Sequence, residues 1–179
     1  MEKLVRELLE EIGENPDREG LVKTPRRVAA MYEFLTSGYH TSLDSIVNQA
    51  IFEEEYDEMV CVTNIEMYSL CEHHLLPFTG VAHVAYLPDE KIIGLGRIAK
   101  VVETLAARPQ LQENLGNEIA DAIEAGLSPK GVLVVLEAKH QCVASRGARQ
   151  PEVETVTSSA RGVMQQIEHR QEAMGLISK

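Results

Sequence analysis

The sequence contains no tryptophan, few aromatic residues and little cysteine. Aromatic residues make up 4% of its 179 positions, and cysteine occurs three times. Three thiols do not form the disulfide framework on which small secreted domains depend, so they indicate a reducing compartment. No apolar run approaches the roughly 18 residues that a membrane span requires. The charged, periodic N-terminus is unlike a signal peptide, and we therefore expect a cytoplasmic protein.

Basic residues are also scarce. Lys and Arg number 17 against 28 Asp and Glu, which gives a formal net charge of −11. Nucleic-acid binding needs a basic face and is not expected. A small phosphorylated ligand needs only a local basic cluster, and the candidates for one are Arg97, Lys100, Arg108, Arg146 and Arg149. The alternative is that these are solvated surface charges on helices and loops.

The N-terminal part of the chain has helical periodicity. Apolar residues recur at helical spacing over 2–13, and Thr24-Pro25 has the residue types of a helix start, with that helix ending at Ser37-Gly38. Residues 39–48 are expected to be irregular or briefly helical. We therefore expect a helical region over residues 1–48, followed by a catalytic region over 49–179 within one functional unit.

From Ala50 onward the hydrophobic period changes to two. Strands are predicted at 51–54, 59–70, 79–87, 131–138 and 153–159, with the last two as partners. Helices are predicted at 97–107, 110–126 and 163–175, and Pro109 and Gly126 are expected to bound the second of them. The acidic stretch 53–58 is interpreted as a hairpin connection, and Pro77 with Gly80 as a bend. This order of elements predicts an α+β domain.

Two segments carry metal-binding chemistry: Cys71-Glu72-His73-His74 and His140-Gln141-Cys142. Thiolates and imidazoles at these spacings are typical zinc ligands. Two sulfurs and one nitrogen would leave a fourth position for water, as in catalytic zinc sites. The remaining histidines would be available for acid–base chemistry. The alternative is ordinary, since a lone Cys or His is usually part of a core or a surface.

Several longer motifs resemble one family. They are DREGLVKTPRRVA at 17–29, TSGY at 36–39, CEHHLLPF at 71–78, GLGRIAKVVE at 94–103, RPQLQE at 108–113, EAKHQC at 137–142, RG at 146–147 and TVTSSARGV at 155–163. In this order they closely resemble GTP cyclohydrolase I, over nearly the whole chain from about residue 2 to 170.

The resemblance implies a tunnelling fold, in which an antiparallel sheet carries two helices on one face and subunits assemble into barrels. It implies homodecamers with active sites at subunit junctions. The implied reaction converts GTP and water into formate and 7,8-dihydroneopterin triphosphate, the entry to folate and pterin synthesis. The same product can also feed deazapurine pathways.

The resemblance also assigns residues. Cys71, His74 and Cys142 match the ligands of Zn²⁺, and His73 and His140 match the catalytic histidines. Six residues match substrate contacts: Gln112 and Glu113 for guanine, and Arg27, Arg97, Lys100 and Arg146 for the triphosphate. This assignment suits the chemistry, because opening the ring needs a nucleophile generated at neutral pH and a proton for the departing nitrogen.

The sequence departs from the family pattern at Ala30, Gly96, Arg97, Lys100, Asn114 and Gly116, and at the pair Val153-Glu154. GLGR replaces the usual GLSK, which removes a serine hydroxyl, and Lys and Arg differ in geometry at a phosphate site. A diverged paralogue that stops at a ring-opened formamidopyrimidine, or that uses another purine nucleotide, is therefore an alternative. An inactive ring-forming scaffold and a structural zinc module with His73 or His140 as fourth ligand are two others.

Overall fold

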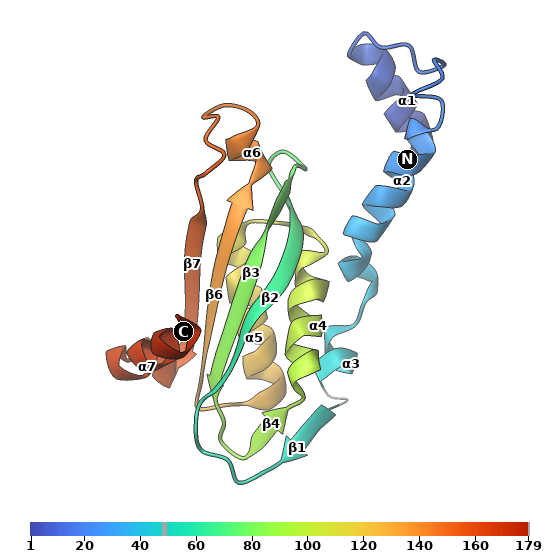
Figure 1. Cartoon of the computed structure of the whole chain (residues 1–179). Helices are drawn as coiled ribbons and strands as arrows, with labels where there is room; N and C mark the ends of the chain where they lie inside the picture. The colour runs from blue at the N-terminus through green and yellow to red at the C-terminus, as the bar shows by residue number, and fades with distance from the viewer. Residues whose placement is uncertain (48–49, 179) are drawn as a thin grey trace.

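The computed structural model describes residues 1–47 and 50–178, and its N-terminal helices form an arm that extends away from a central sheet (Figure 1). The arm contains α1 (Glu2–Glu11) and α2 (Thr24–Leu35), with Pro25 in the first turn of α2, as predicted. Arg6 of α1 donates two hydrogen bonds, of 2.9 and 2.8 Å, to the carboxylate of Asp17 in the intervening turn. The short helices η1 (Ser37–His40) and α3 (Leu43–Val47) lead from the arm toward the sheet.

The central sheet has five strands in the order β5-β2-β3-β6-β7. Their bounds are β2 (Val60–Cys71), β3 (Pro77–Leu87), β5 (Pro109–Gln110), β6 (Gly131–His140) and β7 (Thr155–Gly162). Neighbouring strands are antiparallel, except that β5 pairs in parallel with the end of β2. The predicted pairing of residues 131–138 with 153–159 is confirmed.

Helices α4 (Leu95–Ala106) and α5 (Gln112–Leu127) pack on one face of this sheet (Figure 1). Along β6, Val132 and Val134 face the helices, whereas Leu133 and Val135 belong to a second core on the other face of the sheet. This alternation is the period of a strand buried on both faces. The second core includes Ala173 of α7 (Ile167–Ile177), which follows the short helix η3 (Val163–Gln165). The expected antiparallel sheet with two helices on one face is therefore present.

Strand β2 contains a bulge, where its pairing with β3 shifts between Val62 and Ile65. Val62 and Ile65 both face the helices although they are three residues apart, so one extra residue is accommodated between them. Asn64 takes up the irregularity with a φ of 57°. Its backbone N–H donates a hydrogen bond of 3.3 Å to Nδ1 of His83 on β3.

Three sequence-based interpretations are wrong. The acidic stretch after β1 (Ile51–Glu53) does not form a hairpin with β2, because β1 pairs instead with β4 (Lys91–Ile93) in a separate two-stranded sheet. In that pairing Glu53 lies opposite Lys91, a favourable charge pair. No bend occurs at Gly80, which lies within β3; a Cβ there would be 1.9 Å from the carbonyl oxygen of Glu137 on β6. Gly80 is therefore needed for the close approach of two strands.

The predicted bounds of α5 are the third wrong interpretation. Pro109 does not open this helix but lies in β5, and Gly126 does not close it. The helix ends at Leu127, where Ser128 adopts a left-handed conformation with a φ of 50°. The boundary expected between residues 48 and 49 lies outside the described residues. Within the described part of the chain, no helix has both the length and the apolar character needed to cross a membrane.

Candidate functional site

Strand pairing brings the two predicted metal-binding segments together at one end of the sheet. β2 ends at Cys71, and a short turn leads to β3; within it Leu75 adopts a positive φ of 52° and donates to the carbonyl oxygen of Cys71. β6 ends at His140, which pairs with Phe78 on β3. The chain then enters α6 (Gln141–Ala144), and this helix carries Cys142.

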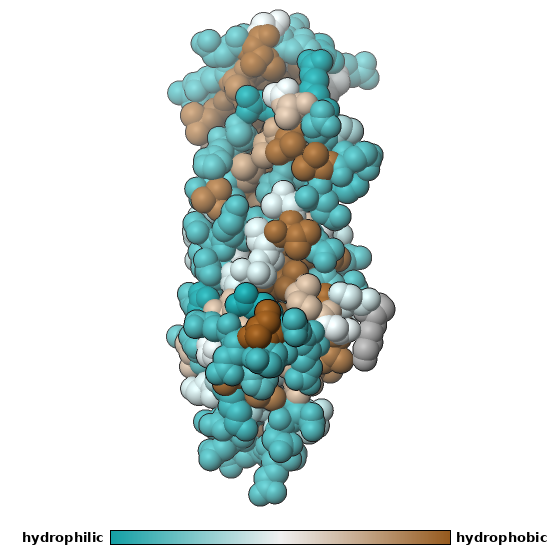
Figure 2. Space-filling model, turned by 90° about the vertical axis from the view of Figure 1, so that its left-hand side faces the viewer, coloured by the Kyte–Doolittle hydropathy of each residue, from teal (hydrophilic) through white to brown (hydrophobic). Residues whose placement is uncertain are grey.

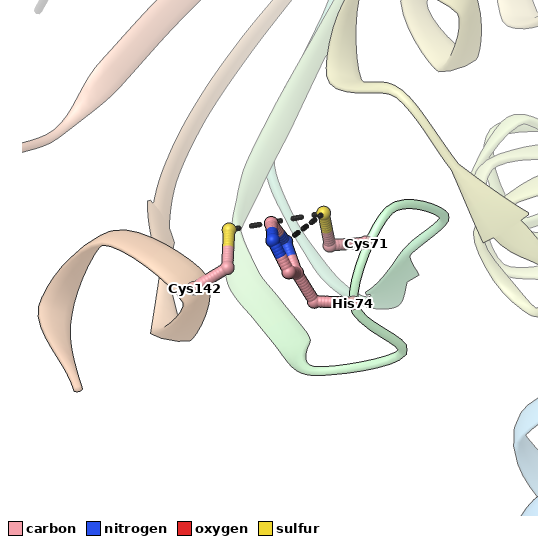
Figure 3. A group of neighbouring side chains, drawn as sticks. All are labelled: Cys71, His74 and Cys142. Carbon is pink, nitrogen blue, oxygen red and sulfur yellow. Dashed lines mark hydrogen bonds between the residues drawn. The ribbon is translucent and has the colours of Figure 1, made fainter. Parts of the chain in front are cut away.

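Cys71, His74 and Cys142 form a compact group with ligand atoms within 4.8 Å of one another (Figure 3). The two sulfurs are 3.7 Å apart, and Sγ of Cys71 is 3.8 Å from Nδ1 of His74. A tetrahedral zinc ion with ordinary bond lengths separates two such ligand atoms by about 3.6–3.8 Å. Neither cysteine is in a disulfide. The donor set and spacing therefore fit zinc.

The environment of the group differs from one ligand to the next. Cys71 is buried, Cys142 is half-buried and His74 is exposed, so the group opens to solvent on the His74 side. Burial raises the pKa of the Cys142 thiol, and the neighbouring Cys71 raises it further, whereas the charge of Arg146 lowers it. A bound metal cation would reverse this tendency, because a coordinating thiol is deprotonated.

His140 lies beside this group and is held on two sides. Its ring stacks on that of Phe78, with centroids 4.5 Å apart and an interplanar angle of 10°. Its Nε2 is 2.8 Å from Oε1 of Gln112. Burial lowers the pKa of His140, and the charge of Glu113 partly opposes this shift. Burial therefore favours the neutral imidazole, while the stacking on Phe78 and the contact with Gln112 orient the ring.

His73 is in a different environment. It lies in the exposed turn between the ligands Cys71 and His74. Its ring meets that of His74 edge-on, with centroids 6.1 Å apart, and its Nε2 is 4.0 Å from a carboxylate oxygen of Glu72. His73 is thus close to the group and exposed at its rim.

The residues expected to read guanine are adjacent but point in different directions. Gln112 begins α5 with only 2% of its surface exposed, whereas Glu113 is exposed. The charge of Glu113 acts on His140, and that of Arg146 acts on Cys142. Both charges are therefore within electrostatic range of the site in a single chain.

The remaining basic residues are not gathered there. Arg97 lies in the first turns of α4, whose other end leads to β5 beside Cys71, so it is roughly 14 Å away along the helix axis. Lys100 on the same helix pairs with Glu103 at 2.8 Å. Arg27 is exposed on α2 in the N-terminal arm. Within one chain, Arg97 and Lys100 thus lie away from the metal group.

Arg108 belonged to the predicted basic cluster, but its contacts are structural. It donates a 3.0 Å hydrogen bond to the carbonyl oxygen of Gly38 and lies over the ring of Tyr39, 5.5 Å from its centroid. Arg108 lies between α4 and β5, so these contacts hold η1 against the C-terminal end of α4.

The residues that depart from the family pattern lie in different parts of the structure. Gly116 is buried where a Cβ would lie 3.0 Å from Oγ of Ser159, so it serves the packing of α5 on β7. Asn114 and Ala30 are exposed on α5 and α2. Gly96 is exposed near Arg97 and Lys100, and a Cβ there would meet no atom within 4 Å. Of these glycines, only Gly96 is close to predicted phosphate contacts.

Sequence reasoning missed Phe78, and it named Gln112 as a guanine contact without foreseeing its contact with His140. Phe78 supports the ring of His140, and Gln112 fixes its Nε2 side. Phe78 follows the CEHH segment at a strand position, but its stacking partner is 62 residues further along the chain. Both contacts depend on the pairing of β3 with β6 and on the docking of α5, which no local motif specifies.

The fold and the site together define a protein of the tunnel-fold class with a Cys-His-Cys metal group. The crystal structure of the archaeosine synthase QueF-Like in its apo form is similar, with a TM-score of 0.51 and 18% identity. The match covers 60% of this chain and 97% of that chain. Identity this low shows the fold alone.

More extensive likeness identifies the family. The family profile described as GTP cyclohydrolase I matches residues 1–178. A Methylococcus capsulatus protein named GTP cyclohydrolase 1 is 51% identical over 180 aligned positions, which cover 100% of this chain and 97% of that protein. A Leptospira biflexa protein of the same name is 55% identical over 163 positions, covering 91% and 89%. The chain belongs to the GTP cyclohydrolase I family, as its motifs predicted.

Proposed function

We propose that this protein is a zinc-dependent GTP cyclohydrolase I. It opens the imidazole ring of GTP at C8, releases formate and forms 7,8-dihydroneopterin triphosphate, the first step of folate and pterin synthesis. The observation that carries the proposal is the zinc-like spacing of Cys71, His74 and Cys142 beside His140. This group of residues occurs in a chain that shares about half of its amino acids with proteins named for this activity.

Three protein ligands leave the fourth position of a tetrahedral zinc site open, which is the arrangement of catalytic sites. Cys71, His74 and Cys142 would hold the zinc, which would lower the pKa of a bound water molecule so that it could act as a nucleophile near neutral pH. His73 and His140 then remain for proton transfer. We assign to His140 the delivery of a proton to the nitrogen that departs from C8, and to His73 assistance in opening the ribose ring.

Glu113 is assigned to guanine recognition. Its exposed carboxylate stands at the first turn of α5, close to His140. A carboxylate accepts hydrogen bonds from guanine N1–H and the 2-amino group, a pattern that adenine does not present. Replacement of Glu113 by Gln should therefore weaken discrimination between GTP and ATP, and unchanged selectivity would count against this role.

The triphosphate contacts support an active site shared between copies of the chain. The charge of Arg146 acts on Cys142, whereas Arg97 and Lys100 lie on α4, away from the metal group of the same chain. In a homo-oligomer, the cations of one subunit can approach the metal group of another. We accordingly assign catalysis to residues 49–179. The helical region 1–48 contributes Arg27 to triphosphate binding.

Two surfaces support assembly, which we propose to be a homodecamer. Helix α1 exposes Leu4, Leu8 and Ile12 to 63%, 59% and 67%, and apolar side chains are visible at the end of the molecule that α1 forms (Figure 2). Among the described residues, β7 pairs with β6 alone, and β2 meets β5 only at its last two residues. Open strand edges and exposed apolar stripes are usually covered by a partner. A 19.9 kDa particle in sedimentation would contradict this proposal.

We place the protein in the cytoplasm. Cys71 and Cys142 must stay reduced to serve as ligands, and their sulfurs are only 3.7 Å apart. A reducing compartment protects such a pair from oxidation.

The proposed function is tested by incubating the zinc-loaded protein with GTP and measuring formate and pterin absorbance together. Equal amounts of both products are expected. Formate without the pterin chromophore would indicate a diverged enzyme that stops after ring opening. Neither product, with zinc confirmed as bound, would overturn the assignment of GTP as substrate.

A further inference from the structure

Both polar atoms of the Gln112 side chain have hydrogen-bond partners within the protein. It is 2% exposed at the start of α5, and its Nε2 lies 3.1 Å from the carbonyl oxygen of Leu136 and 2.9 Å from that of Thr155. Oγ1 of Thr157 is a third neighbour at 3.2 Å. The two carbonyl oxygens can only accept hydrogen bonds, so the amide nitrogen must face them.

This orientation determines which atom faces His140. With the nitrogen directed at β6 and β7, the amide oxygen of Gln112 is the atom 2.8 Å from Nε2 of His140. An amide oxygen has no hydrogen to donate, so the hydrogen in this contact belongs to Nε2. The reversed amide would place oxygen against two carbonyl oxygens in a buried site, which is unfavourable.

We propose that Gln112 is a positioning residue that holds His140 in its Nε2–H tautomer, and that the proton exchanged by His140 during ring opening is carried on Nδ1. A neutral imidazole has a single N–H, so an occupied Nε2 leaves Nδ1 as the basic nitrogen. Nδ1 first accepts a proton from the water that adds to C8. As the C8–N bond breaks, its electron pair stays on the departing nitrogen, which takes that proton from Nδ1. This inference rests on the proposed function for its kinetic part only.

The ring is also fixed in position. Stacking on Phe78 fixes the plane of the imidazole, and the hydrogen bond to Gln112 fixes its rotation within that plane. The buried amide is anchored to β6 and β7 independently of any substrate. Such preorganisation keeps the reactive nitrogen in place before GTP arrives. The side chain of Gln112 is consequently occupied by hydrogen bonds within the protein, and we assign guanine recognition to the adjacent Glu113.

The decisive measurement is the ¹⁵N spectrum of His140 in the zinc-loaded protein labelled with [¹⁵N]histidine, recorded by solid-state NMR on the sedimented assembly. The His140 signals are assigned by their loss in His140→Asn. A protonated and a bare ring nitrogen differ widely in ¹⁵N shift, so the spectrum gives the tautomer directly. Neutral His140 with its hydrogen on Nε2 is expected, and a hydrogen on Nδ1 would overturn the proposal.

Gln112→Met provides the kinetic test, because methionine has a similar shape but cannot accept the imidazole N–H. We expect kcat to fall about 100-fold with KM for GTP changed by less than about twofold, together with a mixture of His140 tautomers. A several-fold rise in KM with kcat and tautomer unchanged would show that Gln112 contacts substrate, and would overturn the proposal.

Gln110→Met is a matched control. Gln110 is another buried glutamine, which donates to the carbonyl oxygen of Leu105 at 3.1 Å and makes no contact with His140. This variant should lose stability but keep the tautomer and the kcat of the folded enzyme. If Gln112→Met fails to fold, the wild-type spectrum still decides. Wild-type turnover of GTP tests the proposed function separately, because the tautomer is measured without substrate.

Discussion

The backbone N–H of Asn64 donates a hydrogen bond to the buried imidazole of His83, so a side chain on β3 satisfies the bulge of β2. This hydrogen bond is part-buried, so its loss should cost less than the roughly 1–3 kcal/mol of a fully buried N–H left without a partner. His83→Leu keeps a side chain of similar volume but removes the acceptor, and should lower the free energy of unfolding by about 1 kcal/mol.

The measurement is urea unfolding at fixed protein and zinc concentrations. His40→Gln, at an exposed position, is the control and should change stability by less than about 0.5 kcal/mol. If His83→Leu were as stable as the parent, another acceptor would have to satisfy Asn64.

Gly80→Ala should be among the most damaging small substitutions in the sheet. The added Cβ would lie 1.9 Å from the carbonyl oxygen of Glu137, so β3 and β6 would have to separate near the metal end. We expect a loss of at least about 3 kcal/mol, measured as a lower thermal midpoint and reduced zinc content. Gly175→Ala, where a Cβ meets no atom within 4 Å on α7, should instead be neutral or stabilising by up to about 1 kcal/mol. Equal stability of the two variants would contradict this account of Gly80.

Gly96→Ser restores the hydroxyl that the family pattern has near the phosphate contacts. The position is open, so the side chain fits without displacing a neighbour. If the hydroxyl contacts the triphosphate, KM for GTP should fall by a few-fold, since one added hydrogen bond contributes about 1 kcal/mol. Gly96→Ala separates this effect from improved helix propensity. The same KM in both variants would show that the hydroxyl makes no contribution.

Cys142→Ala separates a catalytic zinc from a structural one. Cys142 is half-buried on the short α6 at the edge of the core, whereas the sheet is held by its own packing. We expect the variant to lose bound zinc and cyclohydrolase activity but to retain its circular dichroism spectrum. Cys61→Ala should keep both zinc and activity. Global unfolding of Cys142→Ala would instead identify a structural metal site.

The pKa of Asp17 depends on Arg6. The two side chains share a pair of hydrogen bonds, and the guanidinium lowers the pKa of that carboxyl. Because the folded-state pKa lies below the unfolded value of about 3.9, the stabilisation by this pair is present above about pH 4 and is lost as pH falls through the folded-state pKa. Carboxyl ¹³C NMR should show the pKa of Asp17 rising toward its ordinary value in Arg6→Gln. Identical titration curves would refute the coupling.

The sequence was a good guide where the signal is local. Helical spacing and Thr24-Pro25 predicted the two helices of the arm, and residues 71–74 with 140–142 predicted the metal group. The bulge also left a trace, since Val62 and Ile65 break the period of two. Its meaning required the register with β3, which is a long-range property.

Contacts between distant elements could not be predicted in this way. The choice of β4 as the partner of β1 depends on which short strand is within reach after folding. The same holds for Arg108, whose charge suggested phosphate binding but whose position against Gly38 and Tyr39 makes it structural. Charge alone does not distinguish a ligand contact from a tertiary one.

The candidate metal ligands are divided between the end of β2 with its following turn and the helix after β6, and this division affects the order of events during synthesis. Cys71 and His74 leave the ribosome long before Cys142, and the pairing of β3 with β6 must form to unite them. All three proposed zinc ligands would therefore be together only after most of residues 49–179 had been translated and β3 had paired with β6. Bound zinc would then indicate that β6 is in its native register.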